Sequence, residues 1–87
     1  MTLDNFAIKQ PSRFKNAIRI ASMMDSNKNV NWTLSIICKM ASLKIGPATI
    51  AMSWMRKAGL IKGSTIFTIT EDGMRWVQRN RWALNEG

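Results

Sequence analysis

The sequence predicts an α+β fold in which helices dominate. Apolar residues recur at helical spacing in four segments. Two short β-branched segments between the third and fourth of these are separated by a glycine-containing turn, which is typical of a hairpin. A chain of 87 residues, 46% of them hydrophobic, is sufficient for one globular domain with a limited core. We interpret residues 1–11 as an N-terminal arm and residues 12–87 as the domain.

The first predicted helix follows Ser12, whose hydroxyl can cap the exposed amides of a first turn. Its apolar residues have the spacing of one helix face. They are Phe14, Ala17, Ile18, Ala21 and Met24. Residues 25–29 are rich in turn formers and end this helix. Residues 30–32 are predicted to form a short strand, with Trp32 packed against the third helix.

The second helix is predicted to begin after Thr33, another good cap. Four of its residues are expected to face inward: Leu34, Ile37, Cys38 and Ala41. Residues 43–46 are expected to break the chain. Pro47 suits the first turn of a new helix, and Gly59 suits the left-handed position after a helix end. The third helix is therefore predicted over residues 47–58.

At about 100° per residue, the third helix has one apolar and one polar face. The apolar face contains Ala48, Ala51, Trp54, Met55 and Ala58. The opposite face contains Thr49, Ser53, Arg56 and Lys57, with Ile50 and Met52 at its flanks. A solvated surface helix has this pattern, and so does a helix that reads the major groove of DNA. In the second case arginine contacts guanine, lysine contacts phosphate, and Ile50 or Met52 contacts thymine methyl groups.

A hairpin is predicted over residues 60–69, with strands at 60–62 and 66–69 and a turn near Gly63 and Ser64. Thr70 is then expected to cap the last helix, whose first turn contains two acids that complement the helix dipole. The apolar residues of this helix are Trp76, Val77, Ala83 and Leu84.

The formal net charge is +8, and the charges are unevenly distributed. Residues 26–70 contain no acid at all. The cations of that stretch are Lys28, Lys39, Lys44, Arg56, Lys57 and Lys62. The acids outside it are Asp4, Asp25, Glu71, Asp72 and Glu86. This distribution favours an anionic partner, with nucleic acid ahead of a membrane surface. The alternative is a basic, solvated surface without a ligand.

Three sequence motifs resemble the winged helix-turn-helix domains of MarR-, PadR- and ArsR-type bacterial regulators. They are Lys57-Ala58-Gly59-Leu60-Ile61, Phe67-Thr68-Ile69-Thr70-Glu71-Asp72-Gly73 and Ile45-Gly46-Pro47-Ala48-Thr49-Ile50. The resemblance implies a three-helix core, a wing sheet of two or three strands and a C-terminal helix. It also implies binding to double-stranded DNA, with helix 47–58 in the major groove and the wing at 60–69. The expected DNA contacts are Thr49, Ser53, Arg56, Lys57, Lys44, Lys39, Lys62, Ser64 and Thr65.

The residue types present do not favour an enzyme. The chain contains no His and no Tyr, its acids are not paired as in a catalytic dyad, and Cys38 on an apolar stripe is expected in the core. We therefore expect no enzymatic activity, metal, cofactor or small-molecule ligand. We predict a cytoplasmic protein, because there is one cysteine, no signal peptide and no apolar run of membrane-spanning length.

The leading functional prediction is a small, sequence-specific transcriptional regulator that forms a homodimer. Its expected dimer surface includes Phe6, Ile8 and the helix around Trp76 to Leu84, and Trp82 is either an oligomer contact or a partly exposed packing residue. Two alternatives remain open. One is a winged-helix protein-interaction module, an antirepressor or adaptor, that uses Ile50, Met52 and the tryptophans. The other is an RNA or single-strand binder with exposed aromatic residues.

Overall fold

The computed structural model describes residues 11–81. These residues form helix α2 (Pro11–Ser26), helix α3 (Leu34–Ala41), helix α4 (Ile45–Lys57), strand β1 (Ile61–Lys62), strand β2 (Thr68–Ile69) and helix α5 (Glu71–Asn80). The predicted α+β class with a majority of helix is confirmed. Residues 1–10 of the predicted arm lie outside the described residues. Within residues 11–81, no single helix is long and apolar enough to cross a membrane; α3 and α4 meet that test only as a pair, bent by 113°.

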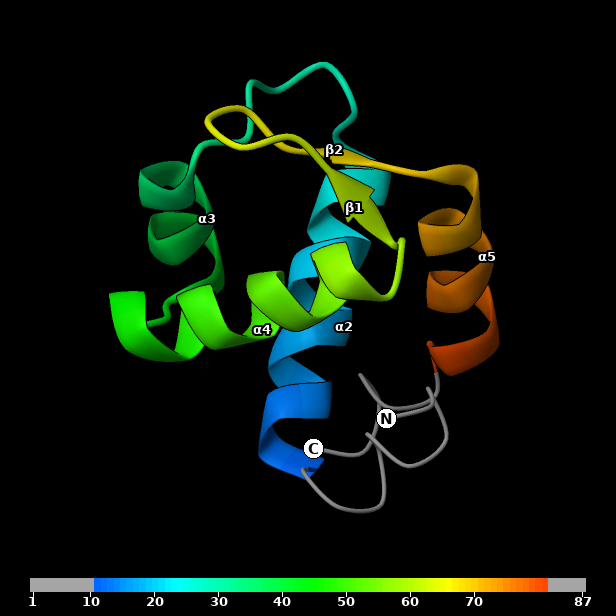
Figure 1. Cartoon of the computed structure of the whole chain (residues 1–87), viewed down its shortest axis with the longest axis horizontal. Helices are drawn as coiled ribbons and strands as arrows, with labels where there is room; N and C mark the ends of the chain where they lie inside the picture. Colours follow the sequence, from blue (N-terminus) through cyan, green and yellow to red (C-terminus); the bar gives the residue numbers. More distant parts are fainter. Residues whose placement is uncertain (1–10, 82–87) are drawn as a thin grey trace.

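Helix α2 runs through the middle of the fold (Figure 1). Helices α3 and α5 lie on either side of it, α4 crosses it, and the β1–β2 hairpin lies across one end (Figure 1). All five residues predicted for the buried face of α2 are buried. The helix begins at Pro11, so the predicted cap Ser12 lies within the first turn instead of before it.

Helix α3 confirms the predicted cap, because the Thr33 hydroxyl accepts a hydrogen bond from the Ile36 amide at 3.3 Å. Ile37 and Ala41 are buried as expected, but Leu34 and Cys38 are only half-buried. The helix ends at Ala41 and is followed by the cap residue Ser42, which has a left-handed backbone with φ of 55°. This conformation is uncommon for a residue other than glycine.

Helix α4 begins at Ile45, two residues before the predicted start at 47, and ends at Lys57. Pro47 is tolerated in its third position because the first backbone hydrogen bond of the helix comes from the next residue, Ala48, to the Lys44 carbonyl at 3.1 Å. Gly59 follows with φ of 77°, as predicted. The Gly59 and Leu60 amides then donate to the carbonyls of Arg56 (3.1 Å) and Met55 (2.9 Å), which closes the helix end.

The hairpin is shorter than predicted. Ile61 pairs with Ile69 and Lys62 with Thr68 in an antiparallel ladder. At Gly63 φ is 110°, and a Cβ there would overlap the Ile66 carbonyl oxygen, so this turn requires glycine. The strand predicted at 30–32 is reduced to one bridge, in which the Phe67 amide donates to the Trp32 carbonyl at 2.7 Å.

The core contains residues from all four described helices and from the hairpin. Trp76 and Val77 of α5 are fully buried, which confirms the predicted stripe as far as it is described; Ala83 and Leu84 lie outside the described residues. The Trp76 ring packs edge-on against Phe14, with 5.8 Å between the ring centroids, and lies 5.9 Å from the Trp54 ring centroid. Trp32 is also buried, and its indole N–H donates to the Asn27 carbonyl at 2.9 Å.

Thr70 caps α5 and also contacts the end of the α4 segment. Its hydroxyl accepts from the Gly73 amide at 3.0 Å and donates to the Gly59 carbonyl at 2.6 Å. We expect Thr70→Val to lower the free energy of unfolding by about 1 to 2 kcal/mol, since it removes both bonds and keeps the branched shape. Urea denaturation measures this change. Thr68→Val, at an exposed β2 position, is the matched control, and an equal loss in both variants would contradict the expectation.

Candidate nucleic-acid interface

The exposed face of α4 carries the side chains predicted for it. Thr49, Ser53, Arg56 and Lys57 are all exposed. On the opposite side, Ala48, Ala51 and Met55 are fully buried, whereas Trp54 is half-buried. Ala58 was predicted on the buried face but is exposed, because the helix ends one residue before it. Two hydroxyls and two cations therefore share one accessible helix face.

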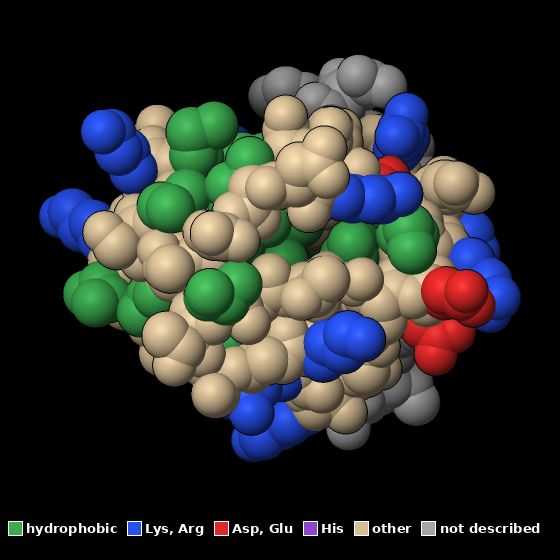
Figure 2. Space-filling model, turned by 90° about the horizontal axis from the view of Figure 1, so that it is seen from above, with side chains coloured by type: hydrophobic (Ala, Val, Ile, Leu, Met, Phe, Trp, Pro, Cys, Tyr) green, Lys and Arg blue, Asp and Glu red, His purple; other side chains and the backbone are tan. Residues whose placement is uncertain are grey.

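The acids of the described region are all engaged in ion pairs away from this face. Figure 2 shows the acidic side chains of one surface gathered at its α5 end. The pairs are Lys28–Asp25 at 3.5 Å, Arg81–Asp25 at 3.8 Å, Arg75–Glu71 at 3.6 Å and Arg75–Asp72 at 3.2 Å. Three cations are thus partly neutralised by the three acids found within residues 11–81.

Five cations of the acid-free stretch at 26–70 have no such partner. Among the described residues, no carboxylate forms an ion pair with Lys39, Lys44, Arg56, Lys57 or Lys62. All five are exposed, and they lie on α3, at the α3–α4 break, on α4 and on β1. This part of the surface therefore retains an uncompensated positive charge, which attracts polyanions.

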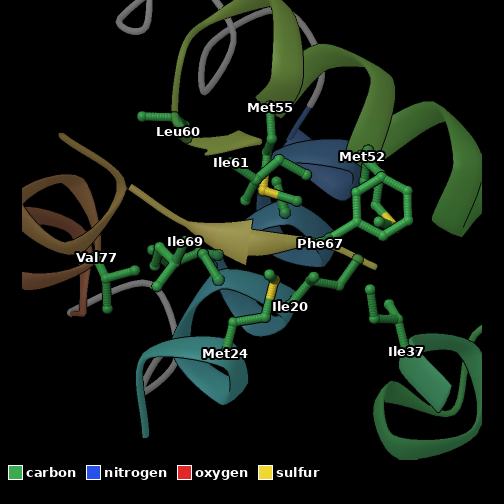
Figure 3. Packing of buried hydrophobic residues seen from close by; sticks show 14 of the residues in the cluster. Ile20, Met24, Ile37, Met52, Met55, Leu60, Ile61, Phe67, Ile69 and Val77 are labelled. Atoms are coloured by element: carbon green, nitrogen blue, oxygen red, sulfur yellow. The ribbon is translucent and has the colours of Figure 1, made fainter. Parts of the chain in front are cut away.

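A groove of about 550 Å³ runs beside α4. It is lined by Thr49, Ser53, Arg56 and Lys57, together with Leu34, Met52 and Phe67. Figure 3 shows Met52 and the Phe67 ring side by side at the edge of the core. The groove thus combines hydroxyls and cations on one helix with an apolar floor from three elements.

The flanks of the α4 polar face differ from the sequence-based expectation. Met52 is 3% exposed, so little of its side chain is available to a partner, and it lies beside Phe67 in the core. Ile50 is 43% exposed and remains available. Ile45 is 67% exposed and was missed, because the predicted helix began only at 47.

The other predicted contacts are exposed but do not line the groove. Lys39 is in the last turn of α3 and Lys44 is at the N-cap position of α4, so both lie near the α3–α4 break. Lys62 is on β1, and Ser64 and Thr65 are in the hairpin loop. Only the four α4 residues come together in one groove.

Only part of the predicted dimer surface lies within the described residues. In that part, Trp76 and Val77 are buried in the core of a single copy, with exposed fractions of 2% and 0%. Phe6, Ile8, Trp82 and Leu84 lie outside the described residues. Among the described residues there is also no group of three or more His, Cys, Asp or Glu side chains that could hold a metal ion.

No family model, curated protein or solved structure matches this chain. A functional assignment therefore depends on the geometry and charge of α4 and its surroundings.

Proposed function

We propose that this chain is a winged helix-turn-helix protein that binds double-stranded DNA in a sequence-specific manner. In this proposal α3 and α4 form the helix-turn-helix, α4 enters the major groove, and the β1–β2 hairpin is the wing. The observation that carries the proposal is the exposed face of α4. It presents two hydroxyls and two cations that no described carboxylate neutralises.

The size and chemistry of α4 suit a major groove, which admits one α-helix. Arg56 and Lys57, in the last turn, provide charge for phosphates, and the Ser53 hydroxyl can bond to phosphate or a base edge. Thr49 is more restricted. Its hydroxyl already donates to the Ile45 carbonyl at 2.6 Å, so its oxygen can only accept from a base amino group.

In this proposal, three further unpaired cations contact the phosphates that flank the groove. Lys39 and Lys44 lie near the start of α4, and Lys62 lies on the hairpin. Electrostatic contacts of this kind supply most of the non-specific affinity for DNA. We further propose a cytoplasmic transcriptional regulator that acts as a homodimer, with two copies of α4 in successive major grooves about 34 Å apart.

The alternative of a protein-interaction module has less support. It required Ile50, Met52 and the tryptophans at the surface. Ile50 is exposed, but Met52, Trp32 and Trp76 are each at most 3% exposed. The same burial removes Trp32 and Trp76 as stacking platforms for single-stranded nucleic acid.

A salt titration on duplex DNA tests the proposal. If all five free cations bind phosphates, log K should fall with log salt at a slope of about −4.5. Arg56→Ala and Lys57→Ala should each weaken binding about fivefold near 0.15 M salt and reduce the slope by about 0.9. The duplex is best chosen by selection from a random pool, which also reports sequence preference and half-site spacing.

Arg79→Ala is the control for that titration, because Arg79 is an exposed cation on α5, away from the α4 face. It should leave the slope unchanged. Absence of duplex binding even at about 50 mM salt, where phosphate contacts are strong, would rule out the proposed function.

A further inference from the structure

The exposed face of α4 is chemically divided along its length. Its N-terminal half presents Ile45, Thr49 and Ile50, and its C-terminal half presents Ser53, Arg56 and Lys57. At about 100° per residue, Ile45, Thr49 and Ile50 lie within one 140° sector. Ile45 and Ile50 are 67% and 43% exposed, so both side chains are accessible to a partner.

The N-terminal half offers no outward hydrogen-bond donor from a side chain. The Thr49 hydroxyl hydrogen is directed to the Ile45 carbonyl. Between Lys44 and Ser53 the other side chains are Ala, Gly, Ile, Met and Pro. Gly46 is exposed, and the space beside its Cα is open. This half is thus apolar and closely approachable, with methyl groups as its main feature.

Among the four bases, thymine alone presents a methyl group in the major groove. Side-chain recognition of guanine there requires a donor for O6 and N7, and no side chain in this half of α4 provides one. In helix-turn-helix proteins the N-terminal residues of the recognition helix contact base edges. We infer that Ile45 and Ile50, with the Thr49 methyl between them, recognise thymine methyl groups of duplex DNA. This inference depends on the proposed function.

The charges around the apolar half favour DNA over a protein as its occupant. Lys39 and Lys44 lie at one end of this half, and Arg56 and Lys57 lie beyond the other. No described carboxylate pairs with any of them. Phosphates on both sides would hold the apolar residues against the base edges between them. The cations position the helix, and the isoleucines discriminate the bases.

The readout expected from sequence alone is therefore changed. Arginine was expected to read guanine, but Arg56 is in the last turn of α4, at the end away from the base-contacting half. Met52 was one expected methyl contact, and it is buried. Bound sites should be marked by thymines at fixed positions more than by guanines.

Replacement of thymine by deoxyuridine tests this inference, since it removes only the methyl group. A duplex selected from a random pool is synthesised with each thymine changed in turn. We expect about a fourfold loss of affinity per contacted methyl, the factor that corresponds to burying one such group. At those positions, Ile45→Ala and Ile50→Ala should weaken binding to the thymine duplex and abolish the difference between thymine and deoxyuridine.

Val30→Ala is the matched control, because Val30 is a 39% exposed apolar residue outside α4. It should retain the full thymine preference. Equal wild-type affinity for both duplexes would overturn the inference and leave DNA binding intact. Absence of any duplex binding would overturn both. A lower oligomeric mass of Ile45→Ala or Ile50→Ala in sedimentation velocity would assign this face to contact between copies, and would also overturn it.

Discussion

Replacing Gly73 by alanine is expected to lower the free energy of unfolding by about 3 kcal/mol. Gly73 lies buried in the first turn of α5, directly against the backbone of Leu60. An added Cβ would overlap the Leu60 carbonyl oxygen and lie 2.7 Å from Cγ1 of Ile69. The carbonyl cannot simply move away, because it accepts the Thr70 amide at 3.0 Å.

Urea denaturation of Gly73→Ala provides the measurement, and Gly46→Ala is its control. Gly46 is also in the first turn of a helix, but no atom lies within 4 Å of its added Cβ. Alanine there should be neutral or stabilising by up to about 1 kcal/mol, as for other glycines in unstrained helical positions. Similar stabilities for the two variants would contradict the close approach of α5 to Leu60.

Charge reversal at Arg56 is expected to have the largest effect on DNA affinity. Arg56→Glu removes one phosphate contact and adds one repulsive charge. Together these correspond to the loss of about two phosphate contacts in the relation between log K and log salt. The predicted loss is about thirtyfold near 0.15 M salt. It should shrink as the salt concentration is raised, because the affinity of the variant falls less steeply with salt than that of the wild type. Fluorescence anisotropy with a labelled duplex measures it.

Arg79→Glu makes the same change in net charge on α5. It should reduce affinity by less than about threefold, through long-range repulsion alone. Equal losses for Arg56→Glu and Arg79→Glu would show that net charge, and not the α4 face, governs binding. The comparison therefore separates a located interface from a generally basic surface.

Local signals in the sequence were sufficient for most helix boundaries. Thr33 and Thr70 cap the helices that follow them, and Gly59 has the predicted left-handed backbone. Each of these features depends on a few neighbouring residues, so spacing alone predicts it. The start of α4 was misplaced because proline is acceptable anywhere in a first turn, and Pro47 therefore marks the turn without marking its first residue.

Features that depend on distant contacts could not be predicted. Met52 is near the edge of the polar face of α4, and it is buried in a core that includes Phe67, fifteen positions later. The left-handed Ser42 has no sequence signal comparable to glycine. Asp25 forms an ion pair with Arg81, which lies far from it in the sequence, at the end of another helix. The number of charges in the sequence therefore could not predict which cations remain unpaired.

The Thr70 hydroxyl connects the end of the α4 segment to the start of α5 through a single oxygen, beside the glycine that lets α5 approach Leu60. The hairpin begins and ends at this same junction. The α4 face and the hairpin are therefore set at a fixed angle when the chain folds. If both contact one duplex, orienting them relative to each other costs no further conformational entropy on association. More of the free energy of the contacts then contributes to the affinity.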